Sequence, residues 1–217
     1  MITIRGGLSK ENYMDFNRLF FEGLLVFIMN KKLIEELSIE ELGKLFPIIL
    51  VDHQDNWKSL YQKEKDYITE TIGEDNIISV NHIGSTAVPV IKSKPTIDIL
   101  LEIKNETDLD NLISNMKNKG YNFIAQPKNP EPHMMFTKGY TINGFKGQAI
   151  HIHVRYEGDW DEIYFCDYLK INPDLAAEYE SLKIELSQKF KNNRELYTEG
   201  KSEFIKNATM TARNKLR

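Results

Sequence analysis

One stretch, VNHIGSTAVPVIKSKPTIDILLEI (Val80–Ile103), constrains the fold of this chain more than any other. It joins two strand-like segments, Ile77–Gly84 and Thr96–Ile103, through residues rich in glycine, hydroxyl groups and proline. In the second segment, apolar residues at alternate positions share one face of a strand, whereas Thr96, Asp98, Leu100 and Glu102 share the other. Asp98 therefore points away from the apolar face, where its carboxylate requires a partner or a function.

The segments around this stretch predict an α+β fold, a mixed β-sheet flanked by helices. Asp55 begins a helix that ends at Gly73, and a polar amphipathic helix ends at Gly120. Strands are expected at YNFIA, HMMFTKGY and GQAIHIHVRY. Two final helices follow, one opened by Asn172 and Pro173 and the other covering Glu195–Arg213.

The length of 217 residues favours one domain, with or without an appendage. We expect the domain in residues 39–217 and an N-terminal extension in residues 1–38. The extension holds the apolar run LFFEGLLVFI followed by MNKKL, which resembles a normal protein start. It is therefore either a helix that docks on the domain or an upstream-start artefact, with Met29 as the natural first residue.

Composition excludes several classes of function. A net charge of −4 argues against non-specific nucleic-acid binding, which requires clustered basic residues. The single cysteine, Cys166, rules out a disulfide framework and favours the cytoplasm. The apolar run is interrupted by Glu22 and is too short for a membrane span, which needs about 20 residues. We expect a cytoplasmic protein without membrane association. Composition does not specify its oligomeric state.

The segment after the first strand is a candidate phosphate site. Gly84, Ser85 and Thr86 are followed by Pro89, a pattern typical of a strand, a turn and a helix. A helix start with free N–H groups and glycine clearance suits a phosphate, although Ser-Thr at this place is more often only a cap. His82 and Lys94 flank the segment, as phosphate donors or as ordinary polar residues.

The order of these motifs resembles the GrpB family (UPF0157), a divergent branch of the nucleotidyltransferase superfamily that includes polymerase β. The resemblance rests on HIGSTAVP and KPTIDIL and continues through KGYTINGFKGQAIHIHVRY, FCDYLKINPDLAAEYESLK and YTEGKSEFI. It implies that Ser85 holds a triphosphate and that carboxylates on two strands hold Mg²⁺. In some relatives a similar module is fused to dephospho-CoA kinase.

The chain departs from the superfamily pattern at its metal site. The second carboxylate, two residues after the first, is replaced by Leu100, and Glu102 lies about 13 Å along the strand from Asp98. Two ligands of one metal must converge more closely than that. The superfamily's pair of carboxylates is therefore missing.

The strand AIHIHVRY offers a replacement, because His151, His153 and Arg155 share one face of it. If this strand neighbours that of Asp98, at about 4.8 Å, the carboxylate and an imidazole would bind one divalent cation. Mg²⁺ or Mn²⁺ is expected, and imidazole favours Mn²⁺, Zn²⁺ or Fe²⁺ over Mg²⁺. Alternatively, the histidines fill a polar sheet face and only hydrogen-bond to Asp98.

Two functions fit these residues. The first is a nucleotidyltransferase acting on a nucleotide or phosphorylated metabolite, and the second is a binding module that lost metal chemistry with its second carboxylate. Leu100 favours the second function and the polar cluster favours the first. Arg194, Tyr197 and Lys201 either reach an anionic ligand across the sheet or form a solvated helix face. The candidate groups are catalytic Asp98, His151 and His153, metal-binding Asp98 and His153, and phosphate-binding His82, Gly84, Ser85, Thr86, Lys94 and Arg155.

Overall fold

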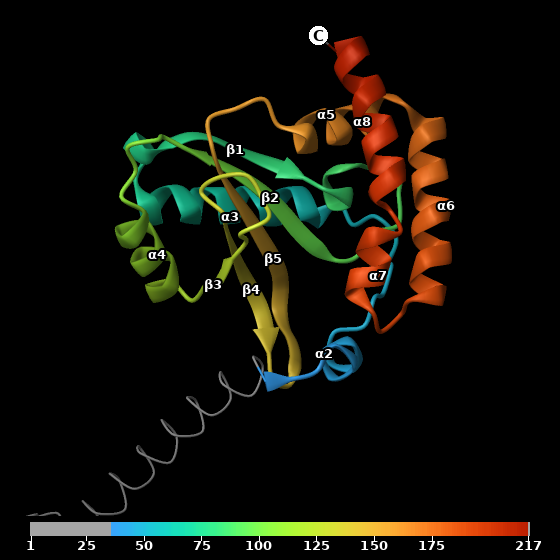
Figure 1. Ribbon diagram of the computed structural model, residues 1–217, viewed down its shortest axis with the longest axis horizontal. Coiled ribbons are helices and arrows are strands. Elements are labelled where there is room, and N and C mark those ends of the chain that lie inside the picture. Colours follow the sequence, from blue (N-terminus) through green and yellow to red (C-terminus); the bar gives the residue numbers. More distant parts are fainter. Residues whose placement is uncertain (1–35, 217) are drawn as a thin grey trace, which may run out of the picture.

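A five-stranded sheet of order β1-β2-β5-β4-β3 forms the centre of the computed structural model, which describes residues 36–216 (Figure 1). Strands β2 and β5 run parallel, and every other neighbouring pair is antiparallel. This mixed sheet with flanking helices confirms the predicted α+β class. The strands are β1 (Ile77–Ile83), β2 (Thr96–Ile103), β3 (Asn122–Ala125), β4 (Met134–Thr141) and β5 (Gly144–Tyr156).

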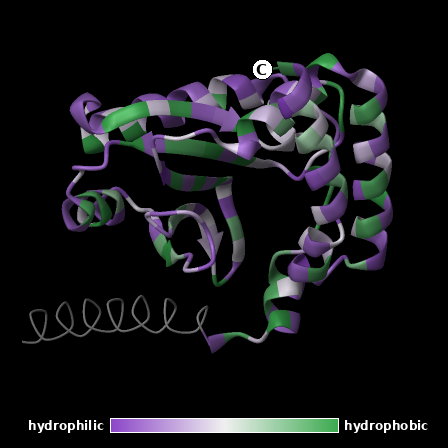
Figure 2. Ribbon diagram, turned by 45° about the horizontal axis from the view of Figure 1, so that its top comes forward, coloured by the Kyte–Doolittle hydropathy of each residue, from purple (hydrophilic) through white to green (hydrophobic). Residues whose placement is uncertain are grey.

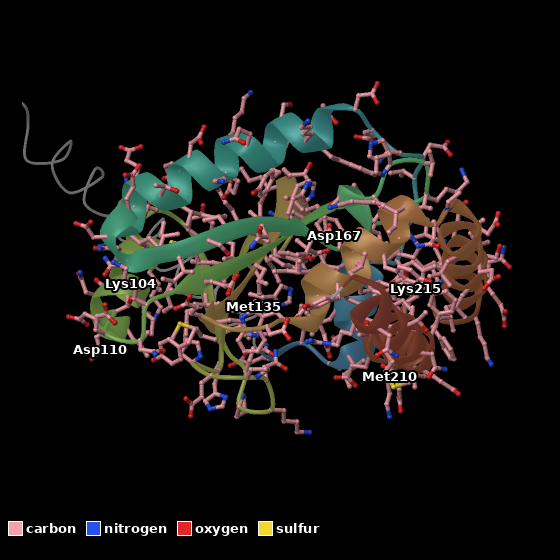
Figure 3. All side chains as sticks on the ribbon, turned by 90° about the horizontal axis from the view of Figure 1, so that it is seen from above. Lys104, Asp110, Met135, Asp167, Met210 and Lys215 are labelled. Atoms are coloured by element: carbon pink, nitrogen blue, oxygen red, sulfur yellow. The ribbon has the colours of Figure 1, made fainter. Side chains whose placement is uncertain are left out.

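One face of the sheet packs on helices α3 (Asn56–Ile72) and α4 (Leu109–Asn118). The isoleucines of β2 alternate toward these helices and are fully buried. They meet Trp57 of α3 and Met116 of α4, which are also fully buried. Seen from above, α3 runs along one side of β1 and β2, opposite the C-terminal helices (Figure 3).

The C-terminal helices form a second cluster around Phe165 and Tyr179. They carry both hydrophobic and hydrophilic residues, as helices with one face on a core do (Figure 2). Helix α5 approaches the sheet on its polar face, where Glu162 contacts Arg155 of β5. The helices are α5 (Asp161–Ile171), α6 (Pro173–Lys189), α7 (Arg194–Glu199) and α8 (Ser202–Leu216).

Two sequence predictions are corrected by these elements. The single helix expected over Glu195–Arg213 is two helices, α7 and α8, which are separated around Gly200. The helix expected after Gly84 is only a 3-10 turn, η2 (Ser85–Ala87). Strands β1 and β2 pair antiparallel, and such a pair needs no helical crossover between its strands.

The described part of the chain starts near helix α2 (Ile39–Leu45), which Ser38 and Glu41 cap reciprocally. A second 3-10 turn, η1 (Glu74–Asn76), precedes β1. The expected extension lies outside the described residues up to residue 35, as does the alternative start at Met29. Within residues 36–216, no helix combines the length and the apolar character that a membrane span requires.

Candidate functional site

Asp98 and His151 meet on the polar face of the sheet, because β2 and β5 are parallel neighbours in which Asp98 pairs with His151 and Leu100 with His153. The Asp98 Oδ1 and the His151 Nδ1 are 3.0 Å apart. One ligand atom from each of Asp98, His151 and His153 lies within 4.8 Å of the others, close enough for one cation. The structure thus brings the three candidate catalytic residues together.

Both ring nitrogens of His151 are occupied. Its Nε2 lies 2.7 Å from the Tyr140 hydroxyl, and Arg194 donates to that same hydroxyl at 3.3 Å. The Tyr140 proton is then directed to Nε2, so Nδ1 carries the proton donated to Asp98. No sequence pattern indicated Tyr140, which reaches this position through a register shift between Lys138 and Tyr140, at Gly139 with φ +88°.

His153 is the imidazole best prepared to bind a metal. Its side chain makes no hydrogen bond within residues 36–216, in contrast to both nitrogens of His151. Burial lowers the pKa of His153, against the opposing charge of Asp98, so its nitrogen lone pair is available at neutral pH. The second carboxylate oxygen of Asp98 supplies a matching hard donor. The residues therefore fit the metal pair expected from the sequence, Asp98 with His153.

The charge of Asp98 is stabilised by its surroundings. Burial alone would raise the pKa of this carboxyl group. The hydrogen bond from His151, the positive charges that His151 and His153 carry at the low pH where Asp98 titrates, and the charge of Lys94 outweigh burial and lower the pKa to about 2. Asp98 is therefore ionised at neutral pH, the state in which it binds a cation.

Three cations from distant segments gather beside this carboxylate: the charges of Lys94 and Lys201 interact with Asp98, and Arg194 interacts with both lysines. Lys94 precedes β2, Arg194 starts α7, and Lys201 precedes α8. Burial and the neighbouring charges of Arg194 and Lys201 lower the pKa of Lys94 to about 8, whereas Asp98 raises it. Burial also lowers the pKa of Lys201.

Two of these cations, Lys94 and Lys201, make cation–π contacts with the buried ring of Tyr197. Its centroid lies 5.7 Å from the Lys94 Nζ and 4.5 Å from the Lys201 Nζ. Three cations against one carboxylate leave an excess of positive charge, which suits an anionic ligand. Arg194, Tyr197 and Lys201 thus lie beside the candidate site, and their role in holding an anionic ligand stays a prediction.

The Gly84 turn lies directly against Asp98. Gly84 has φ +69°, and a Cβ added there would lie 2.6 Å from the Asp98 Oδ2. Glycine is therefore required both by the backbone conformation and by the approach of the carboxylate. Ser85 follows in η2, and its hydroxyl faces that of the buried Tyr179 of α6.

Thr86 and His82 are engaged in packing rather than open to a ligand. The buried Thr86 hydroxyl donates to the Thr96 carbonyl and contacts the His82 Nε2, each at 3.0 Å. His82 pairs with Ile99 and so lies on the face opposite Asp98, stacked on Tyr61 with ring centroids 4.7 Å apart. Burial lowers the pKa of His82 to about 4. The structure does not bring either side chain to the predicted phosphate site.

Arg155 lies at the edge of the cluster, two residues beyond His153 on the same face of β5. It pairs with Glu102, four residues along β5 from His151, which corresponds to about 13 Å. Its guanidinium donates to the Val154 carbonyl and to the Glu162 carboxylate. Glu102 itself accepts hydrogen bonds from Ser79 and from the Gly158 backbone. Arg155 is thus engaged by Val154 and Glu162, and its expected role in binding phosphate stays a prediction.

Comparison with known proteins identifies the family. The family model described as GrpB protein matches residues 47–211. The chain belongs to the GrpB family. Glutamate-rich protein GrpB of Alkalihalophilus pseudofirmus is 37% identical over 163 residues, which is 73% of this chain and 91% of that protein. A crystal structure of conserved protein GrpB from Enterococcus faecalis matches with a TM-score of 0.68 and 26% identity, over 77% of this chain and 99% of the other.

A more distant match is a dephospho-CoA kinase of Mycolicibacterium paratuberculosis, 22% identical over 195 residues. The match covers 79% of this chain and 47% of that protein. This GrpB chain therefore spans about half the length of the kinase.

Proposed function

We propose that this GrpB protein binds a nucleotide or another phosphorylated metabolite together with one divalent cation. Lys94, Arg194 and Lys201 hold the phosphate groups, and Asp98 with His153 holds the cation. The observation that carries the proposal is the grouping of three mutually interacting cations, two of which interact with Asp98, beside an imidazole without a hydrogen bond in the described residues. Such perturbed titratable groups gather at functional sites more often than in structural sheets.

The chemistry best suited to this site is nucleotidyl transfer. An acceptor oxygen attacks the α-phosphorus of a nucleoside triphosphate, the new P–O bond forms, and the bond to pyrophosphate breaks. A divalent cation, when bound, supplies charge neutralisation on the phosphate oxygens. Lys94, Arg194 and Lys201 orient the phosphates and stabilise the charge that develops. Asp98 orients His151, which then accepts the proton of the acceptor after Tyr140 releases its Nε2.

A second candidate function is binding without turnover. Leu100 occupies the position at which the nucleotidyltransferase superfamily has its second carboxylate, and it is fully buried. One carboxylate and one imidazole hold a single cation, which removes the two-metal mechanism. This observation favours a module that senses or carries its ligand. The similarity to a protein named dephospho-CoA kinase makes dephospho-CoA a further test ligand.

A thermal-shift panel tests the binding proposal. ATP, dephospho-CoA and inorganic tripolyphosphate are added with Mg²⁺ or Mn²⁺, and a ligand at 100 times its dissociation constant stabilises the protein by about 2.7 kcal/mol. Lys201→Gln should lower the tripolyphosphate shift, whereas Lys206→Gln, at an exposed lysine of α8, should leave it unchanged. His153→Gln should remove the Mn²⁺ contribution alone. Absence of a shift with every ligand would refute the proposal.

A turnover assay separates the two candidates. Pyrophosphate release from ATP and CTP, measured with Mn²⁺, detects nucleotidyl transfer to an acceptor or to water. Release that requires both Asp98 and His151 supports the enzyme. Saturable binding with no release, across the same panel, supports the binding module.

A further inference from the structure

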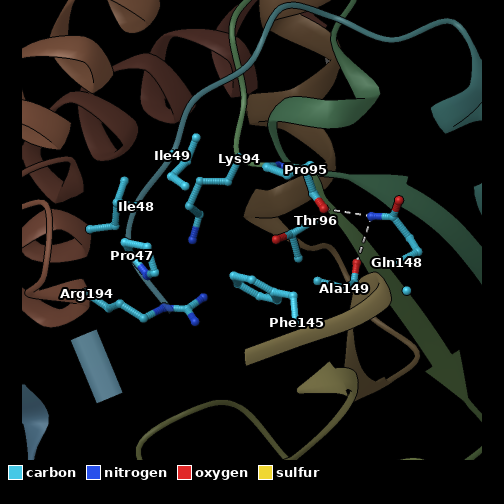
Figure 4. Close-up of a pocket in the computed structure, with 11 residues that line it drawn as sticks. Pro47, Ile48, Ile49, Lys94, Pro95, Thr96, Phe145, Gln148, Ala149 and Arg194 are labelled. Carbon is cyan, nitrogen blue, oxygen red and sulfur yellow. Dashed lines mark hydrogen bonds between the residues drawn. The ribbon is translucent and has the colours of Figure 1, made fainter. Parts of the chain in front are cut away.

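A cavity of about 210 Å³ lies beside the proposed phosphate site (Figure 4). Its apolar lining includes Ile49 and Phe145, which keep 53% and 47% of their surface exposed. Lys94 and Arg194 also line it, and in Figure 4 their charged ends lie on the same side of the Phe145 ring. We call this cavity the recess.

The recess adjoins the metal-binding pair along the strands. Thr96 and Ala149 line it and pair with each other, two residues before the pair Asp98 and His151. Positions two apart share a face of the sheet and are separated by about 6.6 Å. Lys94 lines the recess and its charge acts on Asp98, so a phosphate held by Lys94 would adjoin both.

Few side chains of the lining are placed to read the hydrogen-bonding pattern of a base, because Lys94 and Arg194 are assigned to the phosphate and only Thr96 and Gln148 are otherwise polar. Gln148 is the side-chain amide at its edge, and the Gln148 Nε2 is already bonded to the carbonyls of Pro95 at 2.7 Å and Ala149 at 3.1 Å. The exposed ring of Phe145 is suited to stacking, which is tolerant of the identity of a base. A site that relies on stacking more than on hydrogen bonds to its ligand discriminates weakly between analogues.

The volume limits what enters. Pockets that enclose drug-sized ligands measure about 300–1,000 Å³, more than the recess provides. One ring system fits, whereas a complete nucleoside triphosphate must leave its phosphates outside, among the cations.

We infer that the recess receives the base of a nucleotide and stacks it on Phe145 without selecting between purines and pyrimidines. This inference rests on the proposed function, because the phosphates must bind at Lys94 and Arg194. It narrows the substrate class to phosphorylated compounds that carry a planar ring, and it excludes sugar phosphates and inorganic polyphosphates as the preferred ligands.

Titration calorimetry with excess Mn²⁺ tests the inference. ATP and CTP should bind within about threefold of each other and about tenfold more tightly than inorganic tripolyphosphate, the scale of one stacked base. Phe145→Ala should remove most of that tenfold advantage and leave tripolyphosphate affinity unchanged. Ile49→Gln, at the opposite wall, should reduce the same advantage. Ile171→Gln, at an exposed isoleucine of α5, is the matched control and should change nothing.

The outcomes separate the two proposals. Equal affinity for ATP and tripolyphosphate overturns the recess but supports the phosphate site. No binding of either ligand overturns both. A preference above about thirtyfold between ATP and CTP overturns the claim that the recess does not read the base. Tripolyphosphate affinity also serves as the folding check, because a Phe145 variant that loses it has disturbed Tyr140, which contacts Phe145 with ring centroids 5.3 Å apart.

Discussion

Replacing Asp98 with asparagine removes the carboxylate beside which the three cations gather and preserves the shape of the side chain. The variant keeps an oxygen that accepts the proton of the His151 Nδ1, so the hydrogen bond survives without its charge. Lys94, Arg194 and Lys201 then repel one another with no carboxylate beside them. We expect the variant to be less stable at neutral pH.

The magnitude follows from the lowered pKa. A decrease from 3.8 to about 2 for Asp98 corresponds to roughly 2 kcal/mol of stability at pH 7. The carboxylate side chain retains 27% exposure, so solvent screening reduces the expected loss to between about 1 and 2 kcal/mol. Because the folded pKa lies below the unfolded one, this stability is complete above about pH 4 and disappears as the pH falls toward 2. About half of it remains at pH 3.

Urea denaturation of both proteins at pH 7 and pH 3 measures this loss. With a slope of about 2 kcal/mol per molar urea, the midpoint should decrease by about 0.5–1 M at pH 7 and by half as much at pH 3. Asp75→Asn, at an exposed aspartate in η1, is the control. Equal stability of Asp98→Asn and wild type at pH 7 refutes the electrostatic argument, and an equal loss at both pH values indicates a steric cause instead.

We expect Asp98→Asn to weaken the binding of Mn²⁺ and to strengthen the binding of tripolyphosphate. Stabilisation by Mn²⁺ should disappear, because the hard donor of the metal pair is gone. Metal-free tripolyphosphate should bind more tightly, because the cations no longer neutralise a carboxylate. Loss of both affinities would indicate a misfolded site rather than the role proposed for Asp98.

Three further predictions concern stability. In urea denaturation, Gly84→Ala should lower the free energy of unfolding by several kcal/mol more than Gly120→Ala does. Both glycines have positive φ, but only at Gly84 would an added Cβ clash, because it would lie 2.6 Å from the Asp98 Oδ2. Equal losses in the two variants would contradict this contact. Burial lowers the pKa of Lys183 to about 7, so folding releases a proton between about pH 7 and pH 10. The free energy of unfolding in urea should therefore rise with pH over that range, and the rise should be smaller in Lys183→Met. A chain that begins at Met29 should show the same melting temperature as the full chain, and a decrease of many degrees would assign a structural role to residues 1–28.

Local pattern was sufficient to predict the strand of Asp98 and the face on which it lies. The alternation in TIDILLEI separates the core-facing isoleucines from Asp98 without reference to the rest of the fold. The face of His82 could not be obtained in this way, because it depends on the register between β1 and β2. His82 pairs with Ile99 rather than with Asp98, and a shift of one residue exchanges the two faces.

The sequence predicts only part of the group of cations at the candidate site, which consists of Lys94, Arg194 and Lys201. Lys94 was identified because it precedes the strand of Asp98, but Arg194 and Lys201 come from a helical segment about 100 residues later. Helical periodicity shows that such residues lie on a surface, not which other element that surface meets. The helix predicted after Gly84 was wrong for a related reason. Pro89 favours the start of a helix, whereas Val90 adopts φ +76°, which a helix does not allow.

The dispersed origin of the site has a consequence for the protein during its synthesis. Asp98 and His151 are 53 positions apart, and the Arg194 that joins them through Tyr140 is 54 positions beyond that tyrosine. A chain leaving the ribosome builds β1 and β2 long before α7 emerges, so contacts of this range form late. On the proposed function, the ligand has no complete site until translation has passed Lys201, and it would stabilise finished molecules rather than nascent ones.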